Sequence, residues 1–280
     1  MARDRSSSPE KGARNVRKGI RNFVIGRFPG FGIITWLFFL YLYIPILILV
    51  VFSFNTGRSA TIWNGFSLEW YAHAFANDDI QRAAINSIVV AVSATGAATT
   101  LATFAALVMA RGRKFKGQPA AYAVLMLPLI VPEIVTAVAT LSFFAAVGLK
   151  LGLGRVILAH TVFCVPFAFL PIRARLEGMD DTLEQAAHDL YASDWQTFRH
   201  VTLPLLLPGI ISGAMLAFII SIDDFIITLM VAQAGMTTLP LYIYGMVRMG
   251  ITPEINAVST VMLAISILFV SLSYYIGQRR

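Results

Sequence analysis

The sequence has few charged residues and a single cysteine. Of its 280 residues, 13% are charged and 57% are hydrophobic, and the mean hydropathy is +0.72. Soluble domains carry about 25% charged residues, so this composition excludes a surface that faces mainly water. The lone cysteine, Cys164, excludes an intrachain disulfide and a cysteine-based zinc site, and we expect it to be a small packing residue.

Sequence motifs for nucleotide and metal binding are also absent. No Gly-Lys dipeptide occurs, so the chain has no phosphate-binding P-loop. The histidines show no spacing typical of metal ligands, and they are His73, His160, His188 and His200. We therefore expect no catalytic residue, cofactor or metal in this chain, and we expect His160 to be a packed polar residue.

Long stretches of the sequence contain no charged residue. Four such runs cover residues 28–57, 83–110, 156–172 and 255–278. Two further runs are interrupted only by acids, 117–148 by Glu133 and 201–247 by Asp223 and Asp224. About 20 apolar residues cross a bilayer core as a helix, and nothing here alternates as the strands of a membrane barrel do.

These runs predict an all-α integral membrane protein with six spanning helices. We expect the spans near residues 31–54, 85–110, 119–146, 155–173, 204–231 and 256–277. Pro128 and Pro132 are expected to interrupt the third span. Small residues in the second span favour close contacts between helices.

The 22 basic residues are distributed unevenly around these spans. With the N-terminus in the cytoplasm, 17 of the 22 lie on the cytoplasmic side and five on the other, as the positive-inside rule expects. We therefore expect both termini in the cytoplasm, with 1–27 as a basic arm and 28–280 as the six-span domain. The first apolar run is too long for the core of a signal peptide. Membrane orientation also accounts for the net charge of +7, so no nucleic-acid partner is expected.

The longest expected cytoplasmic loop, at about 174–203, has the pattern of two short amphipathic helices. Asp181 or Thr182 is expected to cap the first helix, whose apolar residues recur at i, i+3, i+4 and i+7. These apolar residues are Leu183, Ala186, Ala187 and Leu190. Ser193 is expected to cap the second helix. Small alanines on such a helix favour a docking surface for a cytoplasmic partner.

This loop resembles the EAA loop of permeases from ATP-binding-cassette importers. That loop reads Glu-Ala-Ala, three residues, Gly, nine residues, Ile, one residue and Leu-Pro. The spacing is kept by Gln185-Ala186-Ala187, Tyr191, Val201 and Leu203-Pro204. Gln185 replaces the glutamate and Tyr191 replaces the glycine. If the glycine position is left-handed, tyrosine costs about 1 kcal/mol there.

The resemblance implies a type I importer permease fold, with this loop seated in a cleft of an ATPase subunit. The docking residues that it implies are Glu184, Gln185, Ala186, Ala187, Asp189, Tyr191, Leu203 and Pro204. It also implies a bacterial inner-membrane assembly with a second, non-identical permease and a solute-binding protein outside the cytoplasm. ATP and Mg would be held by a separate cytoplasmic ATPase dimer.

Further segments are similar to the spermidine/putrescine branch of these permeases. They are Leu127-Pro128, Pro132-Glu133-Ile134, Ser221 to Phe225, Leu239-Pro240 and Gly250 to Ala257. The resemblance implies a polyamine substrate. Related permeases carry aminoethylphosphonate, iron or thiosulfate, so these substrates remain alternatives.

Three acids lie within predicted spans, where an acidic side chain is costly and by default marks a pathway or a partner. They are Glu133, Asp223 and Asp224, and no Lys or Arg in the centre of a span offers an obvious counter-ion. On a continuous helix Asp224 would face protein, and Asp223 would point about 100° away from it. The acids either line a path for an extended polycation or pair with a second permease or with hydroxyls at span ends.

Two other function classes stay open on the sequence alone. An ion-coupled secondary transporter would use the acids as proton sites. A membrane scaffold would transport nothing. The docking loop favours the importer, because a transporter driven by an ion gradient needs no contact with an ATPase.

Overall fold

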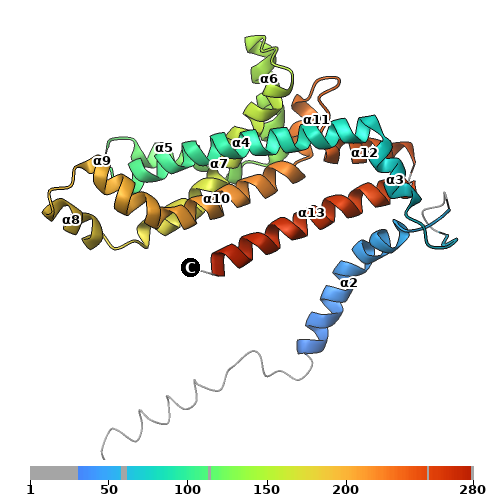
Figure 1. Ribbon diagram of the computed structural model, residues 1–280. Helices are drawn as coiled ribbons and strands as arrows, with labels where there is room; N and C mark the ends of the chain where they lie inside the picture. The colour runs from blue at the N-terminus through green and yellow to red at the C-terminus, as the bar shows by residue number, and fades with distance from the viewer. Residues whose placement is uncertain (1–30, 58–61, 113–114, 251, 279–280) are drawn as a thin grey trace, which may run out of the picture. The chain divides into compact units, whose positions relative to one another are not determined.

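Figure 1 shows the computed structural model, which describes residues 31–57, 62–112, 115–250 and 252–278. The predicted basic arm, 1–27, lies outside these residues. Within the described residues, regular structure is helical apart from one isolated bridge between Asn55 and Phe66. Five of these helices are long and apolar enough to cross a membrane, and a bent helix pair supplies a sixth span if it is counted as one.

The chain divides into two compact units, residues 1–51 and 52–280, which are described separately. The described part of the first unit belongs to helix α2, Phe31–Phe52. Its 22 residues carry no charge, and at 1.5 Å per residue they extend about 33 Å. That length crosses a hydrocarbon core of about 30 Å, in agreement with the first predicted span.

Three long helices form the centre of the second unit. They are α4 (Asp78–Ala110), α7 (Leu153–Glu177) and α10 (Leu203–Asp223), which pack side by side (Figure 1). The remaining helices are α3 (Glu69–Ala76), α5 (Gln118–Ile130), α6 (Glu133–Val147), α8 (Thr182–Asp189), α9 (Asp194–Thr197), α11 (Ile226–Val231), α12 (Leu239–Met249) and α13 (Pro253–Gln278). A π-helical turn, η2 (Phe198–Thr202), joins α9 to α10.

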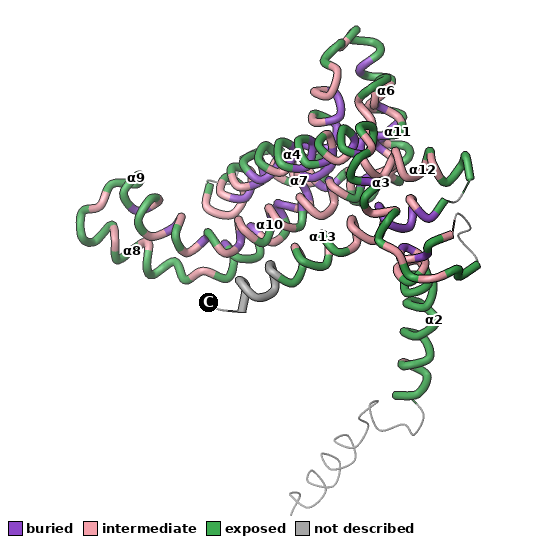
Figure 2. Tube along the Cα trace, turned by 45° about the vertical axis from the view of Figure 1, so that its right-hand side comes forward, coloured by how far each residue is buried: buried purple, intermediate pink, exposed green. Residues whose placement is uncertain are grey.

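Small side chains let the three central helices approach closely. Figure 2 shows buried residues concentrated along α4 and α7, and the buried positions of α4 are mostly alanines. On α10 the buried positions include the small residues Gly209, Gly213, Ala217 and Ser221, which recur every four residues. Cys164 of α7 is buried against this stripe, with its Sγ 3.5 Å from the carbonyl oxygen of Ala217. Its expected packing role is confirmed.

The predicted third span is sharply bent. Helices α5 and α6 meet at 110°, and the residues between them are Val131 and Pro132. The predicted interruption at Pro132 is confirmed, because proline lacks an amide hydrogen and disfavours a helical conformation in the residue before it. Pro128 does not break the chain and remains inside α5.

The predicted continuous span 204–231 is wrong, because it is broken after Asp223. Asp224 is extended, with a ψ of 130°, and α11 begins at Ile226. The Asp224 carboxylate accepts hydrogen bonds from the amides of Ile227 and Thr228, at 3.3 and 3.0 Å. These amides have no carbonyl partner at the start of a new helix, so the aspartate stabilises the break by capping it.

Candidate functional site

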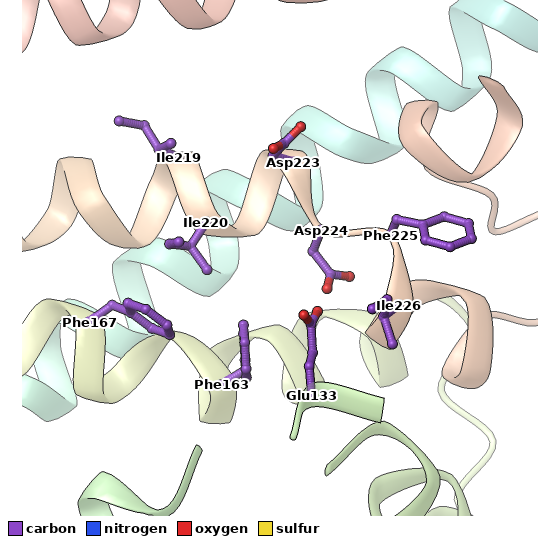
Figure 3. A pocket seen from close by; sticks show the side chains of 9 residues that line it. All are labelled: Glu133, Phe163, Phe167, Ile219, Ile220, Asp223, Asp224, Phe225 and Ile226. Atoms are coloured by element: carbon purple, nitrogen blue, oxygen red, sulfur yellow. The ribbon is translucent and has the colours of Figure 1, made fainter. Parts of the chain in front are cut away.

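The two helix breaks meet at an acidic cavity of about 430 Å³ (Figure 3). Glu133 is the first residue of α6, Asp223 is the last residue of α10, and Asp224 lies in the break itself. Apolar side chains complete the lining, and they are Phe163, Phe167, Ile219, Ile220, Phe225 and Ile226. All three predicted acids thus line one cavity, although Glu133 is about 90 residues away in sequence.

The three acids differ in their surroundings. The carboxyl groups of Glu133 and Asp224 face each other, whereas Asp223 points away from that pair (Figure 3). Asp223 is exposed and Glu133 is half-buried. The Asp224 side chain is only 2% exposed. Asp223 and Glu133 therefore have carboxylate surface to offer a ligand, and Asp224 has very little.

The imidazole of His160, on α7, contacts the Asp224 carboxylate. The imidazole Nε2 lies 3.1 Å from Asp224 Oδ2 and 2.9 Å from the Thr228 hydroxyl. Its Nδ1 lies 2.9 Å from the Ser221 hydroxyl. His160 is buried, as expected, but its partnership with Asp224 was not predicted. A sequence pattern could have predicted this contact. Ser221, Asp224 and Thr228 are spaced three and four residues apart and form a polar face, and His160 is a lone histidine in an apolar helix.

The predicted docking loop forms a second candidate site, which we call the docking segment, Asp180 to Pro204. Helix α8 ends in a Schellman motif, with the Ala192 amide donating to the Ala187 carbonyl at 3.1 Å and the Tyr191 amide to His188 at 2.9 Å. Tyr191 takes the left-handed conformation, with a φ of 61°. The glycine position of the pattern is therefore left-handed, as anticipated.

The start of α8 differs in detail from the prediction. Neither Asp181 nor Thr182 caps the helix through its side chain. The Thr182 amide donates to the Asp180 carboxylate at 2.9 Å, and this hydrogen bond holds the pKa of Asp180 below its usual value. Asp181 instead pairs with Arg111, which follows the last residue of α4.

Glu184 ties the docking segment to two central helices. Its carboxylate lies 3.6 Å from Nε of Arg111 and accepts a hydrogen bond of 2.8 Å from the Thr202 hydroxyl. Arg111 follows α4 directly, and Thr202 precedes α10 directly. We call Arg111, Glu184 and Thr202 the clamp. It joins α8 to both helices at one end of the bundle.

Large apolar side chains of the docking segment are exposed. Leu190, Tyr191 and Trp195 are exposed by 82%, 97% and 65%. Tyr191 belongs to the predicted docking residues, and Leu190 and Trp195 do not. Of the remaining predicted residues, Gln185, Ala186, Asp189 and Pro204 are also exposed, and Glu184, Ala187 and Leu203 are partly buried. Exposed aromatic and aliphatic groups on short helices are typical of a protein-binding surface.

The second helix of the docking segment runs without interruption into the membrane domain. Ser193 and Gln196 form the predicted cap as a reciprocal capping box. From Asp194 the chain continues through η2 and α10 to Asp223, a rod of 30 residues. Pro204 lies in the first turn of α10 and lacks an amide hydrogen, and the turn before it is the wider π type. One rod thus connects the docking segment to the acidic cavity.

Among the described residues, no group of three His, Cys, Asp or Glu side chains is arranged to hold a metal ion. The cavity presents carboxylates and apolar side chains, and the docking segment presents exposed apolar side chains. The cavity suits a cation, and the docking segment suits a protein.

Comparison with known families agrees with this arrangement. Residues 98–280 match the family described as the binding-protein-dependent transport system inner membrane component. The chain belongs to this family. It is accordingly a multi-pass protein of the inner membrane and a component of a transport system rather than an enzyme.

Several relatives cover nearly the whole chain. The spermidine/putrescine transport system permease protein PotC of Haemophilus influenzae is 41% identical over 85% of this chain and 93% of its own length. The putrescine transport system permease protein PotI of Escherichia coli is 37% identical over 87% of this chain and 89% of its own length.

Solved structures share the fold at low sequence identity. A chain of a bacterial transporter that imports the acidic polysaccharide alginate has a TM-score of 0.69 at 14% identity, covering 96% of this chain and 99% of that one. A chain of the MetNI methionine transporter has a TM-score of 0.58 at 19% identity, covering 71% and 94%. The expected importer permease fold is confirmed.

Proposed function

We propose that this chain is one half of the translocation path of an ATP-driven importer for polyamines such as putrescine and spermidine. The observation that carries the proposal is the acidic cavity at the meeting of two broken spans. Polyamines are extended chains whose amines are protonated at neutral pH. Carboxylates attract these amines directly, and the phenyl rings of Phe163, Phe167 and Phe225 attract them through cation–π interactions.

The names of the relatives support the same substrate class. PotC of Haemophilus influenzae is named for spermidine and putrescine, and PotI of Escherichia coli for putrescine. Acids inside a membrane protein are costly and are kept where a cation passes or a partner neutralises them. Thiosulfate is an anion and would be repelled by an acidic cavity, and the phosphonate group of aminoethylphosphonate would be repelled as well, although its amine is protonated.

The docking segment supplies the link to an energy source. We infer that its exposed apolar residues, Leu190, Tyr191 and Trp195, bind a cytoplasmic ATPase dimer that holds ATP and Mg. The expected cytoplasmic location is supported by basic residues at the same end of the bundle, including Arg111 and Arg175. A second permease would complete the path, and a solute-binding protein would deliver substrate from the opposite side.

The 30-residue rod from Asp194 to Asp223 can transmit motion of the ATPases to the acidic cavity. At 1.5 Å per residue it extends about 45 Å. When the ATPases close on ATP, the docked end of the rod would move, and the cavity end would move with it. The path would thereby switch between openings on the two sides, which is alternating access.

The substrate is tested with the complete complex, purified with its own partner subunits and reconstituted in lipid nanodiscs. ATP hydrolysis is measured with the binding protein loaded in turn with putrescine, spermidine, aminoethylphosphonate, thiosulfate or ferric ion. The proposal expects stimulation by the two amines and not by the anions. Stimulation by an anion or by iron alone would leave the family intact and refute the polyamine substrate.

A further inference from the structure

A buried polar pair, His160 and Asp224, lies behind the acidic cavity. Their side chains are 1% and 2% exposed, and the imidazole Nε2 lies 3.1 Å from the carboxylate Oδ2. An acid buried without partners in a membrane domain would be strongly unfavourable. Here the neighbouring residues donate hydrogen bonds to the Asp224 carboxylate, and these bonds offset the cost of burying it.

Both oxygens of the Asp224 carboxylate accept hydrogen bonds from the start of α11. Oδ1 accepts from the Ile227 amide at 3.3 Å. Oδ2 accepts from the amide and the hydroxyl of Thr228 at 3.0 and 3.1 Å. Together with the imidazole, these donors occupy most of the acceptor capacity of the group. Little of it is left for a passing amine.

His160 holds both sides of the helix break at once. Its Nδ1 lies 2.9 Å from the hydroxyl of Ser221, in the last turn of α10. Its Nε2 lies 2.9 Å from the hydroxyl of Thr228, in the first turn of α11. A single side chain of α7 therefore fixes the geometry of the segment in which Asp223 is exposed.

We propose that His160 and Asp224 are positioning residues, and that Asp223 and Glu133 are the acids that meet the substrate. The pair holds the α10–α11 break in the shape that presents Asp223 to the cavity. The inference rests on the proposed function in one respect, namely that the cavity passes a polycation. The inference also assigns different roles to three acids that line the same cavity.

The two roles have different consequences for selectivity. An acid that contacts the substrate contributes more for trivalent spermidine than for divalent putrescine, because the attraction scales with charge. A residue that only holds the break acts on both amines alike. Two residues that act as one unit are also non-additive, so losing both is no worse than losing one.

The test uses the complete transporter in vesicles, with initial uptake of putrescine and spermidine measured for each variant. His160→Leu, Asp224→Asn and the double variant are each expected to lower uptake of both amines about tenfold, with the ratio unchanged within twofold. Asp223→Asn is expected to change the ratio at least threefold. His160→Gln is expected to restore most of the uptake, because its terminal amide can donate to Asp224.

A second readout does not depend on the substrate. Asp223→Cys, in a Cys164→Ala background, is labelled with a charged maleimide, and the labelling rate reports how this position is presented. His160→Leu is expected to change that rate at least fivefold, and His160→Gln to leave it within twofold. If His160→Leu does not assemble, His160→Asn replaces it, because the shorter amide does not reach Asp224.

Three outcomes would overturn the inference. They are a changed spermidine-to-putrescine ratio in Asp224→Asn, additive losses in the double variant, and an unchanged labelling rate in the leucine or asparagine variant. Failure of the wild-type complex to take up either amine would refute the proposed function instead. The labelling rates would still decide whether His160 positions Asp223.

Discussion

Tyr191 is strained by its backbone and not by its side-chain contacts. Among the described residues it is the one non-glycine residue with a positive φ, 61°, and its side chain is 97% exposed. A residue with a Cβ costs about 1 kcal/mol or more in this conformation, because the Cβ approaches the following carbonyl oxygen. We propose that the exposed ring of Tyr191 contacts the ATPase, and that this contact offsets the backbone strain.

Tyr191→Gly should therefore stabilise the end of α8. Relief of about 1 kcal/mol corresponds to about fivefold slower hydrogen exchange of the amides in the segment 183–192. Hydrogen–deuterium exchange with mass spectrometry measures this in the permease without its ATPase. Tyr191→Ala is the matched control, because it removes the ring but keeps the Cβ, and its exchange should stay at the wild-type rate. Equal slowing in both variants would show that the ring, and not the backbone, is the source of strain.

Gly213 lies where α10 packs tightly against α7. A Cβ at this position would lie 2.5 Å from the carbonyl oxygen of Ala168 and 3.1 Å from a side-chain carbon of Ile172. Backbone atoms do not yield as a flexible side chain does, so the helices themselves would have to separate.

Gly213→Ala should destabilise the protein by about 1–3 kcal/mol, the usual cost of overpacking a core. Gly96 of α4 is the control, because nothing lies within 4 Å of a Cβ built there. Gly96→Ala should be neutral or slightly stabilising, since alanine favours a helix more than glycine does. Thermal unfolding in detergent compares the two, and a similar loss in both variants would contradict the packing account.

At the scale of elements, the clamp gives the docking segment two connections to the membrane domain. Glu184 contacts Arg111 at the end of α4 and Thr202 at the start of α10. The side chains of Arg111 and Glu184 are 24% and 21% exposed, so their attraction is screened less than that of a surface pair. Motion at α8 would thus reach both helices, and not α10 alone.

Arg111→Ala should uncouple ATP hydrolysis from transport. We expect uptake to fall several-fold while hydrolysis continues, because the docked segment would move without carrying α4. Glu184→Ala should have the same effect, and the two losses should be non-additive. Arg82→Ala is the control, because Arg82 pairs with Asp79 on its own helix. Loss of hydrolysis in step with uptake would show that Arg111 serves assembly and not coupling.

The helices were predictable from the sequence, and the breaks were predictable only in part. Charge-free runs of about 20 residues have one stable solution in a bilayer, so the spans follow from composition. The break at Pro132 was predictable because proline lacks an amide hydrogen and interrupts a helix. The break at Asp224 has no proline, and it depends on a cap and on His160, which lies 61 residues before Ser221. Only the packing of α7 against α10 brings these groups together.

At the scale of the whole molecule, the docking segment and the acidic cavity are the two ends of one rod. The spacing of the loop residues identified the first end, and the cost of acids in apolar spans identified the second. Their connection was not visible in the sequence, because it requires helix to continue from Asp194 through η2 and past Pro204 to Asp223. The account of transport depends on this continuity.

The most direct test is uptake of labelled putrescine and spermidine by vesicles that contain the complete complex, with and without ATP. Ala186→Glu is the key variant, because Ala186 is exposed on α8 and a carboxylate there would block docking. The account predicts uptake that requires ATP and is lost in Ala186→Glu. Uptake of these amines that is indifferent both to ATP and to this substitution would contradict it.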